Sequence, residues 1–394
     1  MPWDVARRLA HAAARPGKVV SRGLDTAGEC VLATPLVSPV AVPPVDRAAM
    51  DGYAVRGAGP WRVIGQVKAG TADPGALEDG EATGIVTGAA LPDGATSVVR
   101  SEDAAVSGDR LEGAAEDGRH IRRAGEECRP GDHLLPAGVV VTPAVLGLAA
   151  TVGLNRLTVI PSPTVAALVT GDELVHRGPS TPGRVRDAIG PMLPTLITRS
   201  GAKPTAATGE EYGAVRHLGD SREELIDALR ETRADLILVS GSSAAGPADH
   251  LRPALAALGA ELIIDGVACR PGHPQALAQL PDGRLVLGLP GNPFAALVAF
   301  LTLGVAAIRR LRGLPLPELT HIAVPGAIPC HPTSTRLVPV RLTPQGAVPI
   351  GHGGAAMLRG PATADALAVV APGPSEAIAA RLLPLDPGAR PWAG

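Results

Sequence analysis

The chain has 394 residues, of which 45% are hydrophobic and only 2% aromatic, and its formal net charge at pH 7 is −2. This length exceeds that of one ordinary domain and predicts two to four domains. The near-neutral charge gives no support for nucleic-acid binding or for a polybasic membrane surface. The 48 glycines and 40 prolines predict many short elements joined by turns.

We expect a cytoplasmic protein that neither enters nor spans a membrane. The first 18 residues contain no apolar core followed by a cleavage signal, which predicts no secretion. The longest apolar run, residues 294–308, is shorter than the ~20 residues of a membrane span and predicts a buried core helix. The cysteines lack any CxxC spacing and indicate reduced thiols rather than a disulfide frame or zinc site; they are Cys30, Cys128, Cys269 and Cys330.

The first part of the chain predicts one helix followed by short strands. The helix is expected over residues 3–14, and residues 19–44 are expected to be extended because prolines interrupt them repeatedly. Asp-Gly and Gly-rich turns between short apolar runs predict a small β-rich unit over about residues 61–133. Thr142 and Pro143 form an N-cap and first-turn proline, and predict a helix through Ala150.

From about Thr164 onward, aliphatic strands alternate with helical stretches. Strands are expected at residues 165–169, 236–239, 261–264 and 285–287. Ser221 and Glu224 resemble a capping box that opens a helix running to about Arg233. The alternation predicts a parallel α/β sheet covered by helices on both faces. After Pro317 only strands and turns are expected, so the fold class is α/β plus β, with a small C-terminal β domain.

Three of the predicted strands end in polar or sharply bent segments. The first ends at Thr170-Gly-Asp-Glu173, and the second ends at Ser240-Gly241 with Asp249 soon after. The third gives way to a helix through Pro290-Gly-Asn-Pro293, and N–H groups at a helix start favour phosphate. Each motif alone is also explained by simple helix capping. Together, at one sheet edge, they predict a pocket for a phosphate-bearing ligand with a carboxylate cluster for a metal or polar head group.

These motifs also carry a family resemblance. The segments occur in one order: DRAAMDGYAV (46–55), VTGAALPDGATSVV (86–99), RRAGEECRPGD (122–132), TGDEL, SGSSAAGPAD, RPGHP and GLPGNP. In this order the chain resembles the molybdopterin molybdenumtransferase family from Ala27 to about Leu367. The resemblance implies an elongated four-domain homodimer. Its activity would be the insertion of molybdenum from molybdate into adenylylated molybdopterin, with Mg²⁺, release of AMP, and an upstream molybdopterin adenylyltransferase as a partner.

The expected domains are a discontinuous linker and dimerisation domain (1–48 and 134–163), a β-rich inserted domain (49–133), an α/β molybdopterin-binding domain (164–313) and a C-terminal β domain (314–394). By the resemblance, Asp51, Thr87 and Asp132 reach the site from the partner subunit. The resemblance gives the expected catalytic residues as Asp51, Glu173, Asp220, Asp249, Arg270 and His273, of which Glu173, Asp220 and Asp249 would hold the metal. The expected ligand-binding residues are Thr87, Asp132, Thr170, Gly171, Ser240, Gly241, Pro274, Pro290, Gly291, Asn292 and Pro293.

The chain departs from the family where anions would bind. The family's Lys-Pro-Gly-Lys-Pro is Arg270-Pro-Gly-His-Pro274 here, and a further lysine is replaced by Gly266. Family serines correspond to Ala295 and Ala355, and a family arginine to Pro339. Imidazole is cationic only when protonated, so the positive charge available to molybdate and phosphate is reduced. Two interpretations stay open: an insertase with altered anion ligands, and a non-catalytic paralogue acting as a pterin-binding or scaffold dimer.

Overall fold

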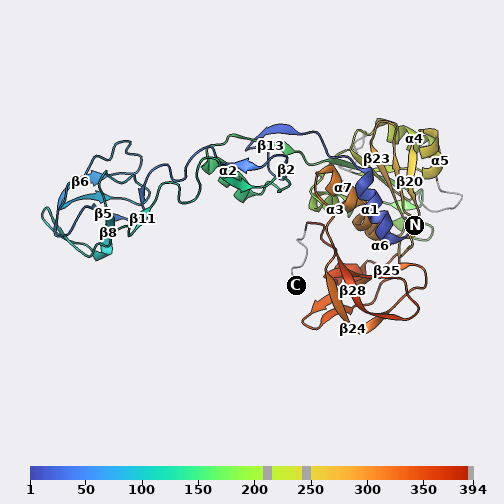
Figure 1. Ribbon diagram of the computed structural model, residues 1–394. Helices are drawn as coiled ribbons and strands as arrows, with labels where there is room; N and C mark the ends of the chain where they lie inside the picture. The colour runs from blue at the N-terminus through green and yellow to red at the C-terminus, as the bar shows by residue number, and fades with distance from the viewer. Residues whose placement is uncertain (207–214, 242–249, 389–394) are drawn as a thin grey trace. The chain divides into compact units, whose positions relative to one another are not determined.

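The computed structural model describes residues 1–206, 215–241 and 250–388. The chain divides into two compact units (Figure 1): the first comprises Met1–Val20, Glu29–Val31 and Val159–Gly394, and the second comprises Ser21–Gly28 and Leu32–Thr158. This division is coarser than the four domains expected from the sequence, whose boundaries remain a prediction.

The second unit contains the expected β-rich segment as a six-stranded sheet of order β8-β5-β7-β6-β10-β9. Its strands are β5 (Gly52–Val55), β6 (Trp61–Val67), β7 (Glu81–Ile85), β8 (Ser97–Arg100), β9 (Ala105–Ser107) and β10 (Arg110–Glu112). Side chains alternate between the faces of a strand, so Ala54 packs in one hydrophobic cluster with Ile85 while Val55 packs in another with Trp61. Both faces of this small sheet therefore contribute to a core.

Short strand pairs and one helix complete the second unit. Strand β4 (Arg47–Ala48) pairs with β11 (Ile121–Arg122), and β3 (Leu36–Val37) pairs with β12 (His133–Leu135). Helix α2 (Pro143–Thr151) begins as expected, because the Thr142 hydroxyl accepts a hydrogen bond from the Val145 N–H at 3.4 Å. The other short elements between residues 20 and 160 are β1 (Val20–Gly23), β2 (Val31–Leu32), the 3₁₀ turn Ser101–Asp103 and β13 (Arg156–Ile160).

The first unit is built on a seven-stranded sheet of order β17-β14-β19-β23-β22-β20, with β18 also paired to β14. Its strands are β14 (Thr164–Thr170), β17 (Lys203–Pro204), β18 (Val215–Leu218), β19 (Leu236–Ser240), β20 (Glu261–Asp265), β22 (Ala276–Gln279) and β23 (Leu285–Leu289). The central strands β14, β19 and β23 are parallel, as expected. Residues 261–264 form β20 as expected, and β20 runs in the same direction as the central strands. It joins them through β22, which the sequence did not predict and which is antiparallel to both β20 and β23. A tight turn joins β22 to β23, and such turns connect only antiparallel strands.

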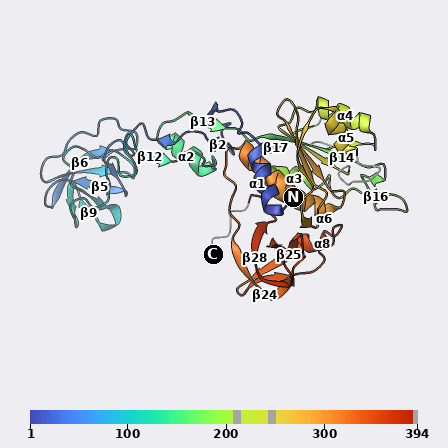
Figure 2. The same cartoon turned by 45° about the vertical axis from the view of Figure 1, so that its right-hand side comes forward.

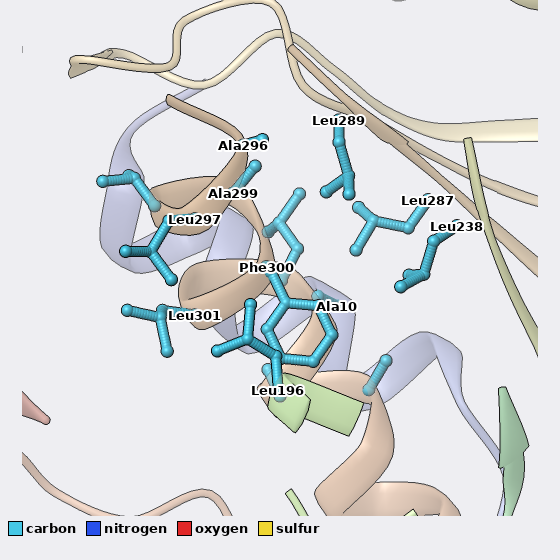
Figure 3. Close-up of a cluster of buried hydrophobic side chains, with 14 of the residues drawn as sticks. Ala10, Leu196, Leu238, Leu287, Leu289, Ala296, Leu297, Ala299, Phe300 and Leu301 are labelled. Carbon is cyan, nitrogen blue, oxygen red and sulfur yellow. The ribbon is translucent and has the colours of Figure 1, made fainter. Parts of the chain in front are cut away.

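Helices cover both faces of this sheet (Figures 1 and 2). Helices α1 (Trp3–Ala13), α3 (Leu193–Arg199), α6 (Pro293–Ala299) and α7 (Val305–Leu311) pack on one face, and α4 (Arg222–Glu231) and α5 (Leu251–Ala257) on the other. Alternate residues of β14 enter the two layers, because Val165 packs in the first cluster and Ala166 in the second. In Figure 3, Phe300 lies between helix residues and the strand residues Leu238 and Leu287.

Two helix predictions are confirmed with adjustments. The apolar run forms a continuous helix, Pro293–Leu311, in which α6 and α7 are joined by a π-helical turn (Phe300–Gly304). Its length and composition would suffice to cross a membrane, but 83% of its most apolar window is buried inside the protein. Helix α4 begins after Ser221, whose hydroxyl accepts from the Glu224 N–H at 3.2 Å. The Glu224 carboxylate accepts from the Gly219 N–H instead of from Ser221, so the capping box is only half formed.

A second sheet of the first unit has the order β21-β25-β27-β28-β24, with β26 paired to β25. Its strands are β21 (Cys269–Arg270), β24 (His321–Pro329), β25 (Thr335–Thr343), β26 (Gly346–Pro349), β27 (Ala366–Val370) and β28 (Glu376–Pro384). The expectation of strands and turns alone after residue 317 is incomplete, because helix α8 (Arg359–Thr363) also forms there. Strand β21 comes from the α/β segment yet joins this C-terminal sheet, and this connection positions the candidate site.

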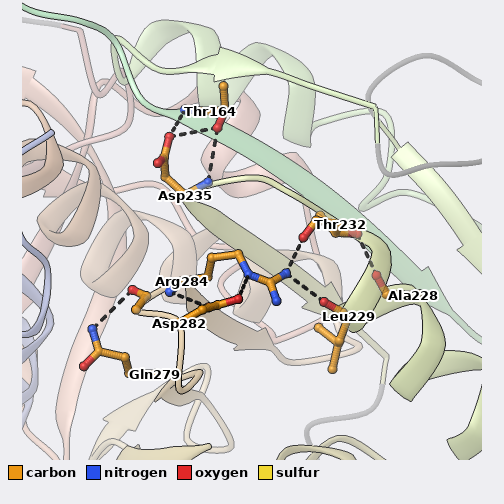
Figure 4. Close-up of polar contacts among 9 residues, drawn as sticks. Thr164, Ala228, Leu229, Thr232, Asp235, Gln279, Asp282 and Arg284 are labelled. Atoms are coloured by element: carbon orange, nitrogen blue, oxygen red, sulfur yellow. Dashed lines mark hydrogen bonds and ion pairs between the residues drawn. The ribbon is translucent and has the colours of Figure 1, made fainter. Parts of the chain in front are cut away.

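The amino edge of the α/β sheet is fastened by side-chain hydrogen bonds (Figure 4). The Asp235 carboxylate accepts from the N–H of Thr164 at 2.7 Å and from its hydroxyl at 2.8 Å. The Arg284 guanidinium donates to the carbonyl oxygens of Leu229 and Thr232 at the end of α4. The polar strand ends singled out in the sequence lie at the opposite, carboxyl edge, where β14 ends at Thr170, β19 at Ser240 and β23 at Leu289.

Candidate active site

Three strands of the α/β sheet end together at its carboxyl edge. The Thr170 hydroxyl donates to the Ser240 carbonyl oxygen at 3.2 Å. A Cβ atom on Gly241 would lie 2.2 Å from the Thr170 carbonyl oxygen, and one on Gly291 would lie 3.8 Å from the Gly241 Cα. The predicted residues Thr170, Ser240, Gly241 and Gly291 are thus close together, and glycine at 241 permits the contact with Thr170. The structure brings these strand ends together as parallel pairing predicts.

The bend between β23 and α6 is closed by the C-terminal segment. Asn292 is the N-cap of α6 with an extended backbone, and Pro293 at the first helical position has no N–H to satisfy. The next two N–H groups, of Phe294 and Ala295, donate to the Ala355 carbonyl oxygen at 2.9 and 3.1 Å. These two donors are already used. Pro290, Gly291 and Asn292 therefore shape the edge of the site, and these particular N–H groups do not point to a phosphate.

Carboxylates gather on the loops that follow β14 and β18. The Asp172 N–H donates to Asp220 Oδ2 at 3.3 Å, and the Asp220 N–H donates to Asp172 Oδ1 at 3.2 Å. The Glu173 carboxylate folds over Gly171, where a Cβ atom would lie 2.7 Å from Oε2. Asp249 lies outside the described residues. The sequence had singled out Glu173 and Asp220, and the structure adds Asp172 to them.

A cavity of about 840 Å³ lies between the segment around Arg270 and the C-terminal sheet. Its basic lining residues are Arg270, His273, His331 and Arg336. Two positions at which family side chains are replaced, Pro339 and Ala355, line the same cavity. Departures that are scattered along the sequence therefore meet at one place, and Ala355 joins this cavity to the start of α6.

Gly266 and His273, which both replace family lysines, are neighbours in the structure. His273 Nδ1 lies 2.8 Å from the Val267 carbonyl oxygen. A carbonyl only accepts, so Nδ1 carries the hydrogen and the tautomer is set by that contact. A Cβ atom on Gly266 would lie 3.4 Å from His273 Cε1, and the φ of Gly266 is +78°. The imidazole ring therefore lies beside the position from which a side chain at residue 266 would project.

The predicted partner-reaching residues lie in the second unit. Asp51 Oδ1 accepts from the Thr87 N–H at 2.6 Å and from its hydroxyl at 2.8 Å. These hydrogen bonds, the backbone one first, lower the pKa of Asp51 and keep its carboxylate ionised. Asp132 lies in a separate turn, where its carboxylate accepts from the Arg129 N–H at 2.7 Å. The structure thus brings Asp51 and Thr87 together.

Sequence reasoning missed Arg336 and His331, although both line the cavity. Arg336 reaches it because β25 pairs in parallel with β21, which puts Arg336 in register with Arg270. The residue types from Thr335 to Val338 form no motif that marks Arg336. The segment that this strand meets is decided by tertiary pairing.

Two protein families match consecutive parts of the chain: the MoeA N-terminal region (domain I and II) over residues 1–153, and the probable molybdopterin binding domain over residues 166–310. Molybdopterin molybdenumtransferase 2 of Mycobacterium tuberculosis is 36% identical over 325 residues, covering 76% of both chains. The molybdopterin molybdenumtransferase of Synechococcus elongatus is 33% identical over 364 residues, covering 86% of this chain and 87% of the relative. Among solved structures, a molybdopterin biosynthesis MoeA protein from Pyrococcus horikoshii superimposes with a TM-score of 0.76 at 26% identity, covering 98% of this chain and 99% of that one.

Proposed function

Because the chain belongs to the molybdopterin molybdenumtransferase family, we propose that it inserts molybdenum from molybdate into adenylylated molybdopterin in molybdenum-cofactor biosynthesis. The observation that carries this proposal is the 840 Å³ cavity, where Arg270 and Arg336 lie side by side next to the carboxyl edge of the α/β sheet. A cavity of this size accommodates a small ligand, and its basic lining suits an anion.

Molybdate would bind in this cavity. Its two negative charges need fixed positive charges, and the guanidinium groups of Arg270 and Arg336 remain charged at all physiological pH values. His273 and His331 add positive charge when protonated. Arg336 supports the insertase interpretation in particular, because it adds a cation to a site in which the family lysines are replaced.

The pterin ligand would lie along the carboxyl edge, over Gly241 and Gly291, where no Cβ atom obstructs it. The buried Ser240 hydroxyl has no hydrogen-bond partner among the described residues. A buried polar group of this kind is usually satisfied, so a ligand group is a natural partner for it. Thr170 and Pro274 would complete this edge.

Mg²⁺ fits the oxygen donors of this edge, because Glu173 and Asp220 carry exposed carboxylates and Asp249 is the predicted third ligand. When bound, the ion would neutralise phosphate charge on the adenylylated ligand. We propose a cytoplasmic homodimer in which Asp51, Thr87 and Asp132 complete the neighbour's site. An upstream molybdopterin adenylyltransferase would supply the substrate.

The proposal is tested by complementation of a bacterial strain that lacks its own insertase, scored by molybdoenzyme activity without added molybdate. We expect the wild-type chain to restore activity and the double variant Arg270→Ala/Arg336→Ala to restore none at equal expression. Arg341→Gln, a change on the same strand as Arg336 but outside the cavity lining, should behave as wild type. Absence of activity with every variant, including wild type, would favour the non-catalytic scaffold instead.

A further inference from the structure

A second cluster of metal-ligating side chains lies apart from the basic cavity. Within residues 1–206, 215–241 and 250–388, one group of at least three such residues has all its ligand atoms within 4.8 Å of one another: His176, Asp187 and His217. His217 Nε2 lies 3.0 Å from Asp187 Oδ2. The imidazole rings of His176 and His217 have their centroids 3.7 Å apart. The ligand atoms of two imidazoles and one carboxylate are thus close enough to share one ion.

The fold brings these residues together from three segments. The short strands β15 (Leu174–Val175) and β16 (Val185–Arg186) run parallel with Val175 opposite Arg186. The residues that follow them, His176 and Asp187, therefore leave the pair side by side. His217 lies on β18, which pairs with β14. No local spacing in the sequence marks the cluster.

Asp187 is oriented by the backbone. Its Oδ1 atom accepts from the N–H groups of Ile189 at 2.9 Å and Gly190 at 3.0 Å, and the residue is only 5% exposed. These bonds leave Oδ2 directed at His217. Outer hydrogen bonds of this kind fix the direction of carboxylates that bind metal ions.

Gly190 keeps the space around the cluster open. A Cβ atom there would lie 2.3 Å from Asp187 Oδ2 and 3.4 Å from His217 Nε2. A cavity of about 170 Å³ is lined by the three residues and by Gly190, Pro191 and Pro194. This volume is large enough for a water molecule beside the cluster, and such a water would provide a fourth ligand.

We propose that His176, Asp187 and His217 bind one divalent transition-metal ion of the Zn²⁺ or Co²⁺ type, with water as the fourth ligand. Metal bonds of ~2.0–2.1 Å in a tetrahedral site separate ligand atoms by roughly 3.3 Å. The 3.0 Å contact between His217 and Asp187 therefore has to open by only a few tenths of an ångström, with loss of the proton between them. Nitrogen ligands favour these ions over Mg²⁺, so this site is distinct from the proposed Mg²⁺ ligands.

The bound ion would tie residues 176–187 to the sheet edge at β18. Arg186 also lines the cavity, and its guanidinium donates to the Val175 carbonyl oxygen at 3.5 Å. Its positive charge opposes a bound cation, so neutralising it should tighten binding. This gives the test a variant of opposite sign.

The test is a Co²⁺ titration of untagged, EDTA-treated full-length protein, followed by visible absorption and then Zn²⁺ competition. We expect one Co²⁺ per chain with the strong absorption of a four-coordinate ion, and displacement by Zn²⁺. His176→Ala, a change at an exposed residue, should weaken Co²⁺ binding at least tenfold, and Arg186→Gln should strengthen it. His321→Ala, a change at an exposed histidine of the C-terminal sheet, should leave it unchanged.

Equal Co²⁺ affinity in wild type and His176→Ala would overturn the proposal and leave Asp187 and His217 as a structural hydrogen-bonded pair. Displacement of Co²⁺ by millimolar Mg²⁺ would also overturn it, because the ion would then be held by oxygen ligands elsewhere. Thermal unfolding adds a second readout. Zn²⁺ should raise the Tm of the wild type and not that of His176→Ala, whose fold is checked by circular dichroism.

Discussion

Arg270 and Arg336 are register partners on the adjacent parallel strands β21 and β25, and both line the same cavity. Like charges on adjacent strands repel each other. A bound dianion would convert that repulsion into attraction for both side chains. We therefore propose that the pair is a preformed anion site, although its two members come from different segments of the chain.

Replacing Arg336 tests this site directly. We expect Arg336→Gln to raise the molybdate concentration needed for half-maximal insertion by about tenfold or more, because a hydrogen bond to a charged group contributes about 1.5–3 kcal/mol. The measurement is molybdate-dependent cofactor formation in vitro. Arg341→Gln, on the same strand, should change this concentration less than twofold. Equal effects of the two changes would mean that Arg336 acts only through the overall charge of the protein and does not contact molybdate.

Gly266 sets a limit on restoring the family pattern. Gly266→Lys alone should destabilise the protein by about 1–3 kcal/mol, because a side chain at φ +78° is strained. Its Cβ would lie 3.4 Å from His273 Cε1, which is an ordinary contact and adds no clash. Chemical denaturation of the single variant and of Gly266→Lys/His273→Gly tests this, because the double variant should keep the cost that is due to backbone strain.

The sequence predicted the strand-helix alternation and the polar strand ends well, because hydrophobic periodicity and turn residues are local signals. It did not predict β22, which runs antiparallel to its neighbours β20 and β23, since an aliphatic strand looks the same in either direction. Arg336 and the cluster of His176, Asp187 and His217 were missed for a related reason. Their significance depends on which strands become neighbours, and that is decided by tertiary pairing.

The Asp51 and Thr87 contact predicts a measurable titration. The carboxyl group of Asp51 should titrate below its usual range, because the Thr87 N–H and hydroxyl both stabilise the ionised form. Thr87→Val removes only the hydroxyl and should raise the pKa of Asp51 part of the way. Carbon-13 NMR of labelled aspartate measures this, with Thr151→Val as control. A folded-state pKa that is lowered contributes stability above the unfolded value of ~3.9, and the contribution is lost as pH falls.

Cysteine reactivity should follow burial. Burial raises the pKa of the Cys269 thiol to about 12, despite a hydrogen bond from Gln275. We expect iodoacetamide at pH 8 to modify the partly exposed Cys330 in the native protein and to leave the buried thiols untouched until denaturant is added; these are Cys30, Cys128 and Cys269. Peptide mass spectrometry reads the sites. Modification of Cys269 as fast as Cys330 in native protein would show that the β21 segment opens readily.

The last prediction concerns Arg284, which fastens the amino edge of the α/β sheet to the end of α4 (Figure 4). Its side chain is 16% exposed, and it donates to the Leu229 carbonyl oxygen at 2.8 Å, to that of Thr232, and to Asp282 Oδ2 at 2.7 Å. A cation at a helix carboxyl end also interacts favourably with the helix dipole. Arg284→Met keeps the aliphatic stem but removes every donor, and should cost about 2 kcal/mol of the free energy of unfolding.

This loss of unfolding free energy is measured by urea unfolding, with the transition of the α/β unit as the readout. Arg230→Met is the matched control, because Arg230 is 62% exposed and its pair with Asp227 at 3.5 Å should contribute less than about 0.5 kcal/mol.

The stability lost in Arg284→Met should also depend on pH. Burial acts to raise the pKa of Asp282, but hydrogen bonds from the Arg284 N–H and guanidinium outweigh it and lower that pKa. A lowered pKa contributes stability above the unfolded value of ~3.9, and this is lost as pH falls through the folded value. The difference between wild type and Arg284→Met should therefore be full at pH 7 and smaller at pH 3. A difference independent of pH would mean that the carbonyl contacts of Arg284, rather than its pair with Asp282, account for its whole effect.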